Sequence, residues 1–136
     1  MQPNEEYRHT HPHVPVERDG HDELPVPSAW RPTLVAIVDA FVRGDYRLAG
    51  GVPGVAPVDD ETAQQIGDAI ADYGATLVAL PPATWSTSVC MRMEDHWSLL
   101  VDLWTEEEGC SDLVLEVRVT EDGGGYLVTV YMVYVP

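Results

Sequence analysis

The sequence contains no lysine. Its 7 basic residues are all arginine and are opposed by 23 acidic residues, which gives a formal net charge of -16 at pH 7. Arg31, Arg43, Arg47, Arg92 and Arg118 stand singly among carboxylates, whereas phosphate binding requires clusters of basic side chains. We therefore expect no nucleic-acid partner and no binding to an anionic membrane surface. The charge favours a basic protein as partner, although solubility alone would also explain it.

Long apolar runs and a dense cysteine pattern are missing as well. No apolar run approaches the roughly 20 residues that a membrane-spanning helix needs, and residues 1–6 do not resemble a signal peptide. The two cysteines, Cys90 and Cys110, need no disulfide in a chain of 136 residues, which is long enough to bury a core. We expect a cytoplasmic protein with two free thiols.

Residues 1–27 have many prolines and almost no large apolar side chains. Such a segment cannot bury enough surface to order itself, so we expect a disordered tail before a single domain over residues 28–136. The tail contains His9, His11, His13 and His21, and alternating imidazoles can chelate divalent metals. Structural metal sites have closed ligand sets on ordered elements, so we expect adventitious metal binding here or none.

Two helices are expected at the start of the domain. Apolar residues recur at helical spacing from Trp30 to Phe41, Ile37 among them, with Pro32 in the first turn and Gly44 at the end. A second helix is expected from Asp59 or Asp60 to Gly74, because acidic residues suit the start of a helix and glycine its end.

The rest of the chain alternates with a period of two residues, which is typical of β-strands. The expected strands span residues 76–80, 86–93, 96–105, 112–120 and 126–135. Tight turns are expected at residues 94–95 and at the three glycines of residues 121–125. The predicted fold class is α+β, with two N-terminal helices packed on one face of a mainly antiparallel sheet of four to five strands.

The alternation also predicts which side chains leave the core. Trp97, Leu99, Val101 and Leu103 should face the helices, and so should Leu113, Leu115, Val117 and Val119 of the next strand. The intervening residues, including His96, Asp102, Trp104, Glu116 and Arg118, should then face outward. The last strand is apolar on both sides, and we favour the Thr129 and Tyr131 side as outward.

No catalytic constellation emerges from the spacing. Ser86 or Ser88 with His96 and Asp102 fails as a triad, because Asp102 lies about 20 Å from His96 along an extended strand and no activating turn holds the serine. The residues Glu106, Glu107 and Glu108 match no calcium-binding loop, and consecutive glutamates are more typical of a solvated turn. We expect no catalytic residue, no metal site and no cofactor, and the oligomeric state stays open.

Six short segments give the chain a likeness to a known group. They read FVRGDY (41–46), DYG (72–74), LPP with TW (80–85), DLWT with EG (102–109), SDL (111–113) and YVP (134–136). Over about residues 30–136 the sequence resembles a bacterial domain family of unknown function. The resemblance implies no activity and no catalytic residue. In its small, acidic, two-layer character the chain is also similar to the immunity proteins that neutralise bacterial toxins, a likeness of type rather than of motif.

The sequence leads to two hypotheses of function, a protein-binding module and a ligand-binding or catalytic domain. The leading hypothesis is a protein-binding module, such as an immunity-type inhibitor of a basic toxin or enzyme, whose acidic, aromatic outward face docks on the partner. Its candidate partner-binding residues are Asp102, Trp104, Glu106, Glu107, Glu108, Asp112, Glu116 and Tyr131. The alternative is a small-ligand-binding or catalytic domain that uses a cleft near Cys90 and His96.

Overall fold

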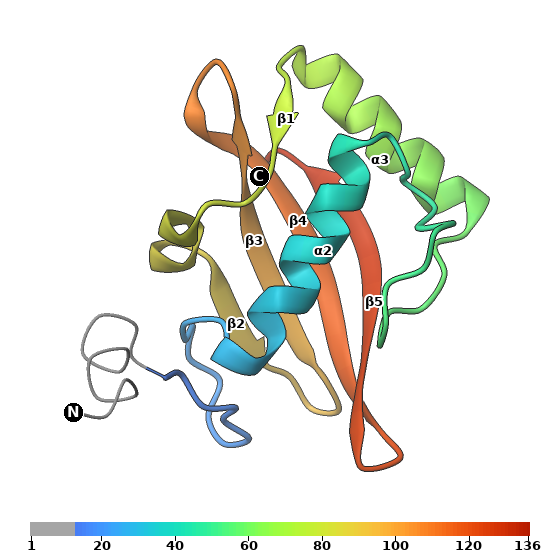
Figure 1. The fold of residues 1–136 in the computed structure, drawn as a ribbon. Coiled ribbons are helices and arrows are strands. Elements are labelled where there is room, and N and C mark those ends of the chain that lie inside the picture. Colours follow the sequence, from blue (N-terminus) through green and yellow to red (C-terminus); the bar gives the residue numbers. More distant parts are fainter. Residues whose placement is uncertain (1–12) are drawn as a thin grey trace, which may run out of the picture.

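The computed structural model describes residues 13–136, so His9 and His11 lie outside the described residues. The elements, drawn in Figure 1, are η1 (Ser28–Trp30), α2 (Arg31–Val42), α3 (Asp60–Tyr73), β1 (Leu77–Val78), η2 (Pro82–Ser86), β2 (Val89–Arg92), β3 (Trp97–Thr105), β4 (Gly109–Asp122) and β5 (Gly125–Tyr134). The predicted α+β class and the mainly antiparallel sheet are confirmed. No helix within residues 13–136 has the length and apolar character required to cross a membrane.

All pairs of these strands are antiparallel. β3 pairs along one side with β4, which in turn pairs with β5, while β2 and β1 pair with successive parts of its other side. The β4–β5 hairpin closes through Gly123 and Gly124, whose φ angles are 55° and 84°. Two successive positive φ angles explain why the sequence has glycines at this turn.

Both helices begin and end close to the predicted residues. The Asp59 carboxylate accepts the backbone N–H of Thr62 at 2.7 Å, and α3 ends at Gly74 in the left-handed conformation with φ 78°. α2 follows directly on η1 and has Pro32 in its first turn. Figure 1 shows α2 lying across the sheet and α3 running beside β5.

The core is built from one side chain in two along β3 and β4. All eight residues predicted to face inward, from Trp97 to Leu103 and from Leu113 to Val119, are at most 1% exposed. Ile37 and Phe41 of α2 are buried against the same cluster. The predicted inward residues of both strands and the register of the first helix are therefore confirmed. Val114, which was expected to face outward between Leu113 and Leu115, is nevertheless buried as well.

The last strand departs from simple alternation because it contains a β-bulge. Val117 pairs with Val130 and Glu116 pairs with Met132, so Tyr131 has no partner in β4. The extra residue reverses the alternation: Val128 and Val130 are buried, but the next buried residue is Val133. Thr129 and Tyr131 avoid the core as predicted, whereas the placement of Val133 outward and Met132 inward is wrong.

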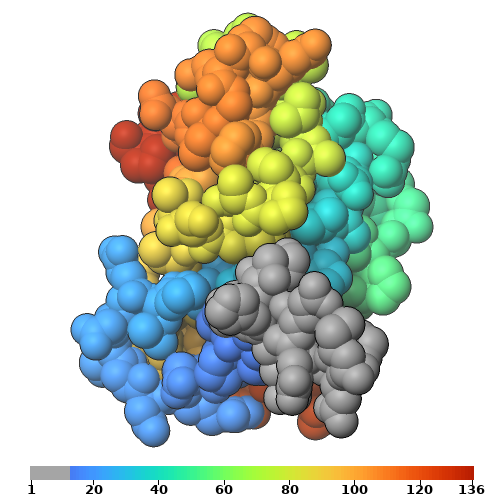
Figure 2. Space-filling model, turned by 60° about the vertical axis from the view of Figure 1, so that its left-hand side comes forward, coloured from blue at the N-terminus to red at the C-terminus, as the bar shows by residue number. Residues whose placement is uncertain are grey.

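Residues 13–27 pack on the domain, in contrast to the expectation of a disordered tail over residues 1–27. Leu24 and Cys90 exchange backbone hydrogen bonds of 2.9 and 2.7 Å, which extends the sheet beyond β2. Val26 is fully buried, and the Glu17 carbonyl accepts the Trp97 indole N–H at 2.8 Å. Figure 2 shows this blue segment lying against the rest of the molecule. A few well-placed contacts order the segment despite its low apolar content. We call residues 13–27 the N-terminal strap.

Candidate functional site

The structure gathers most predicted binding residues on the side of the sheet that faces away from the core, which we call the outer face. Across it, Leu100 pairs with Glu116 and Glu116 with Met132, while the neighbouring row joins Asp102, Val114 and Tyr134. Residues paired across antiparallel strands have side chains about 5 Å apart. Acidic and apolar side chains therefore alternate in close contact on this face.

Tyr131 is the most exposed of the predicted aromatic residues, at 42%. The guanidinium carbon of Arg118 lies 4.0 Å from its ring centroid, and Arg118 Nη1 donates to its hydroxyl at 3.3 Å. The bulge directs Tyr131 away from the core beside Met132, which is 36% exposed. The stacked arginine favours this orientation of the exposed ring, by about 0.5 to 1 kcal/mol.

Trp104 packs against the fold more than its predicted role as a partner-binding residue implies. Its ring lies against Gly109, where an added Cβ would stand 3.6 Å from the ring, and the side chain packs on the core cluster. The indole N–H is buried and finds no hydrogen-bond acceptor among the described residues. Trp104 thus covers the β3–β4 hairpin.

Asp102 is fixed by three hydroxyl groups from the η2–β2 segment. Thr87 donates to its carboxylate at 2.5 Å, Thr84 donates to its carbonyl at 2.6 Å, and its own N–H donates to Ser88 Oγ at 3.0 Å. Asp102 and Asp112 line a hollow of about 450 Å³ on the outer face next to Pro136. The structure therefore brings these two predicted residues together.

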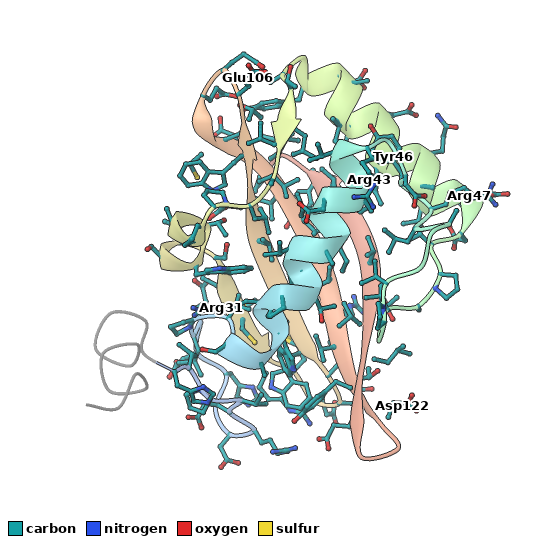
Figure 3. The ribbon with its side chains drawn as sticks, in the orientation of Figure 1. Arg31, Arg43, Tyr46, Arg47, Glu106 and Asp122 are labelled. Atoms are coloured by element: carbon teal, nitrogen blue, oxygen red, sulfur yellow. The ribbon has the colours of Figure 1, made fainter. Side chains whose placement is uncertain are left out.

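The three glutamates of the β3–β4 turn have different roles. The Glu107 carboxylate accepts the backbone N–H of Thr76 through both oxygens at 2.9 Å, and the Glu106 N–H donates to the Thr76 carbonyl at 2.9 Å. Figure 3 shows Glu106 at one end of the sheet, with Asp122 near the other. Because Glu107 ties the turn to the segment before β1, only part of this charge is free to meet a partner.

Glu108 and Asp112 flank the phenol of Tyr73 at the end of α3. The Asp112 N–H donates to the phenol oxygen at 3.2 Å and lowers the pKa of Tyr73, but the hydrogen bond to Glu108, burial and the two carboxylate charges raise that pKa overall. Asp112 is thus held by its backbone, with its side chain exposed.

The alternative pair, Cys90 and His96, does not meet in one cleft. Burial raises the pKa of the Cys90 thiol to about 12, which leaves it protonated and unreactive at neutral pH. The thiol lines a cavity of about 150 Å³ with Arg92, Trp97 and residues of the N-terminal strap, and His96 is not among the lining residues. His96 instead contacts the Asp95 carboxylate at 2.7 Å. Residues 13–136 contain no cluster of three side chains arranged to hold a metal ion.

Sequence reasoning missed a larger feature, a groove of about 700 Å³ between α3 and the end of β5. Its lining includes the carboxylates of Glu61, Asp68 and Asp72, spaced seven and four residues apart on one helix face. This spacing can be read from the sequence and indicates an acidic helix face. The sequence could not show, however, that this helix face would border the end of the last strand.

Comparison with known proteins assigns most of the domain to a family. No curated protein and no solved structure matches the chain. A family model described as "Domain of unknown function (DUF7668)" matches residues 38–136, which covers α3, all five strands and the C-terminal part of α2. The match confirms the resemblance to an uncharacterised family over most of the domain. The chain therefore belongs to the DUF7668 family of domains of unknown function.

Proposed function

We propose that this protein is a protein-binding module whose outer face docks on a basic protein, in the manner of an immunity-type inhibitor of a bacterial toxin or enzyme. The observation that carries the proposal is the exposed pair Tyr131 and Met132 beside Glu116, in a chain with a net charge of -16. Interface centres are enriched in tyrosine and methionine, and charged groups at the rim steer the partner. The proposal includes a bacterial origin and a cytoplasmic site of action.

The contact of Tyr131 with Arg118 supports this use of the outer face. Tyr131 is already stacked on Arg118, so little side-chain entropy would be lost when a partner covers the ring. The proposal takes both helices to lie on the core side of the sheet. The alternation of buried and partly exposed residues along β3 supports that arrangement.

The distribution of acidic groups supports a basic partner. Glu106 and Asp112 lie near one end of the outer face and Asp122 lies near the other, whereas the Glu121 carboxylate forms an ion pair with Arg18 of the N-terminal strap. Arg118 is basic and was predicted to face outward on this side of the sheet. Its guanidinium group stacks on the Tyr131 ring. A basic surface would therefore meet acidic groups around an aromatic and aliphatic centre.

Parallel affinity capture from a bacterial lysate tests the proposal. The baits are the wild-type chain, a Tyr131→Ala/Met132→Ser variant, and a control variant Val42→Ser/Met93→Ser, which removes two equally exposed apolar side chains elsewhere. We expect wild type and control to retain the same basic protein in a salt-sensitive manner, and the outer-face variant to retain at least about tenfold less. Equal retention by all three baits, or retention of acidic proteins alone, would contradict the proposal.

A further inference from the structure

The groove between α3 and β5 has the composition of a recognition site for a positively charged extended chain. Among the described residues, the lining contains three carboxylates and no basic side chain. Leu113 and Val133 are buried beneath the groove, and its accessible apolar part includes Ala69 and Val135, which is 52% exposed. Tyr73 and Tyr134 complete the apolar lining. A volume of about 700 Å³ falls in the range typical of ligand sites.

The carboxylates of this groove are available to a ligand. Within residues 13–136, no hydrogen bond or ion pair engages the carboxylates of Glu61 and Asp72, and Asp68 accepts only the Gln64 amide at 2.9 Å. All three acidic residues are exposed. The groove can therefore accept cations without breaking an internal ion pair.

Asp72 also lies where a carboxylate does not help the helix. It is in the last turn of α3, two residues before the C-cap Gly74, and this turn contains no basic residue. The C-terminal end of a helix carries partial negative charge, so an acidic side chain there is unfavourable. A carboxylate that opposes the stability of its own helix is better explained by binding than by folding.

The spacing of these carboxylates matches an extended chain. Along the helix axis, at 1.5 Å per residue, Asp68 and Asp72 are about 6 Å apart, and Glu61 lies about 10 Å from Asp68. Side chains on one face of an extended peptide repeat about every 6.6 Å, since successive residues rise about 3.3 Å. Basic residues at alternate positions would thus reach Asp72 and Asp68, and the apolar residues between them would face Tyr134 and Val135.

We propose that this groove binds an extended segment of a partner protein in which lysine or arginine alternates with apolar residues. The inference rests on the proposed function, because it assigns a second contact surface for the same basic partner. A second copy of this chain is a poor occupant, because each copy carries a net charge of -16. The mixed lining favours a peptide over a simple polycation, because apolar side chains of a peptide would cover Tyr134 and the exposed Val135.

Titration of the full chain with the peptide acetyl-(Lys-Val)₄-amide tests this inference. We expect saturable binding that weakens about tenfold in a Glu61→Gln/Asp68→Asn/Asp72→Asn variant at low salt, and that falls further as salt is added. The control Asp19→Asn/Asp22→Asn/Glu94→Gln makes the same change in net charge on exposed residues outside the groove. It should bind within about twofold of wild type.

Three results would overturn the groove proposal: no saturable binding, equal loss in both triple variants, or binding of spermine as tight as that of the peptide. The Tyr131→Ala/Met132→Ser variant separates this inference from the proposed function. It should bind the peptide normally and still lose the captured partner. If that variant keeps its partner while the groove variant loses the peptide, the outer-face proposal fails and the groove proposal stands.

Discussion

The side-chain amide of Gln65 on α3 forms two hydrogen bonds with the backbone of Val133 on β5. It donates to the Val133 carbonyl at 2.6 Å and accepts the Val133 N–H at 3.1 Å. Nearer the start of β5, the Val128 N–H donates to the Gly54 carbonyl at 2.8 Å, and the Val128 carbonyl accepts the Ala56 N–H at 2.9 Å. These contacts occupy backbone groups that an edge strand would otherwise offer to another chain.

We expect Gln65→Leu to lower stability and to promote self-association. The substitution leaves a partly buried N–H and C=O of Val133 without partners, which costs about 1 to 3 kcal/mol. Urea unfolding measures the loss, and size-exclusion chromatography over a range of concentrations detects pairing through β5. Gln64→Leu is the control, because Gln64 bonds only to Asp68 on the same helix. Equal stability and equal self-association of the two variants would show that the backbone of β5 does not depend on the hydrogen bonds from Gln65.

The N-terminal strap should contribute measurably to stability. A chain that begins at Pro27 loses the fully buried Val26, the Leu24–Cys90 pairing and the Glu17–Trp97 hydrogen bond. We expect its melting temperature to fall by about 5 °C or more relative to a chain that begins at His13. Val26→Ala in the full chain should cost about 1 to 3 kcal/mol. Identical melting of the two shortened chains would mean that these contacts add nothing in solution.

Charge reversal should separate the roles of the turn glutamates. Glu107→Lys removes the acceptor of the Thr76 N–H and should lower stability by about 1 kcal/mol, whereas Glu106→Lys should leave stability unchanged. Thermal melting of the two variants makes the comparison. With a partner in hand, Glu106→Lys should slow association, because rim charges act mainly through the on-rate. A destabilised Glu106→Lys variant would contradict the assignment.

The two thiols should differ in reactivity. Cys90 is 5% exposed with a pKa of about 12, while Cys110 is exposed, although burial and the charges of Asp102 and Asp112 raise its pKa as well. We expect a thiol reagent at pH 8 to modify Cys110 in the native protein, and to modify both cysteines only after unfolding. Mass spectrometry of the labelled peptides identifies the modified residue. Rapid native labelling of Cys90 would show that the strap opens readily.

The same burial makes stability depend on pH in the alkaline range. The pKa of Cys90 in the folded chain lies above its ordinary value of 9.0, so its contribution is complete below about pH 9 and is lost as pH rises towards 12. The slope approaches about 1.4 kcal/mol per pH unit. Urea unfolding at several pH values should therefore show a flatter profile for Cys90→Ala than for wild type. Cys110→Ala should leave the profile close to that of wild type.

Local signals in the sequence determined the helices, most of the strands and the inward faces of β3 and β4. Asp59 and Gly74 bound α3 because their interactions involve residues three positions away, and Gly123 and Gly124 close a hairpin because their own φ angles are positive. The alternation of Leu113 to Val119 likewise needs only neighbouring residues. Each of these features depends on short-range chemistry that a single sequence displays.

Tertiary structure decided the features that define the candidate sites. The bulge at Tyr131 depends on which residue of β4 lies opposite, and an apolar strand with two similar faces does not specify that register. Glu107 reaches Thr76 across 31 residues and Gln65 reaches Val133 across 68, so neither contact leaves a local pattern. The N-terminal strap is ordered by pairing with β2 rather than by its own apolar content. The amino-acid composition determined the net charge of this protein. Long-range contacts decided which carboxylates are free at the surface and which, like that of Glu107, form hydrogen bonds that stabilise the fold.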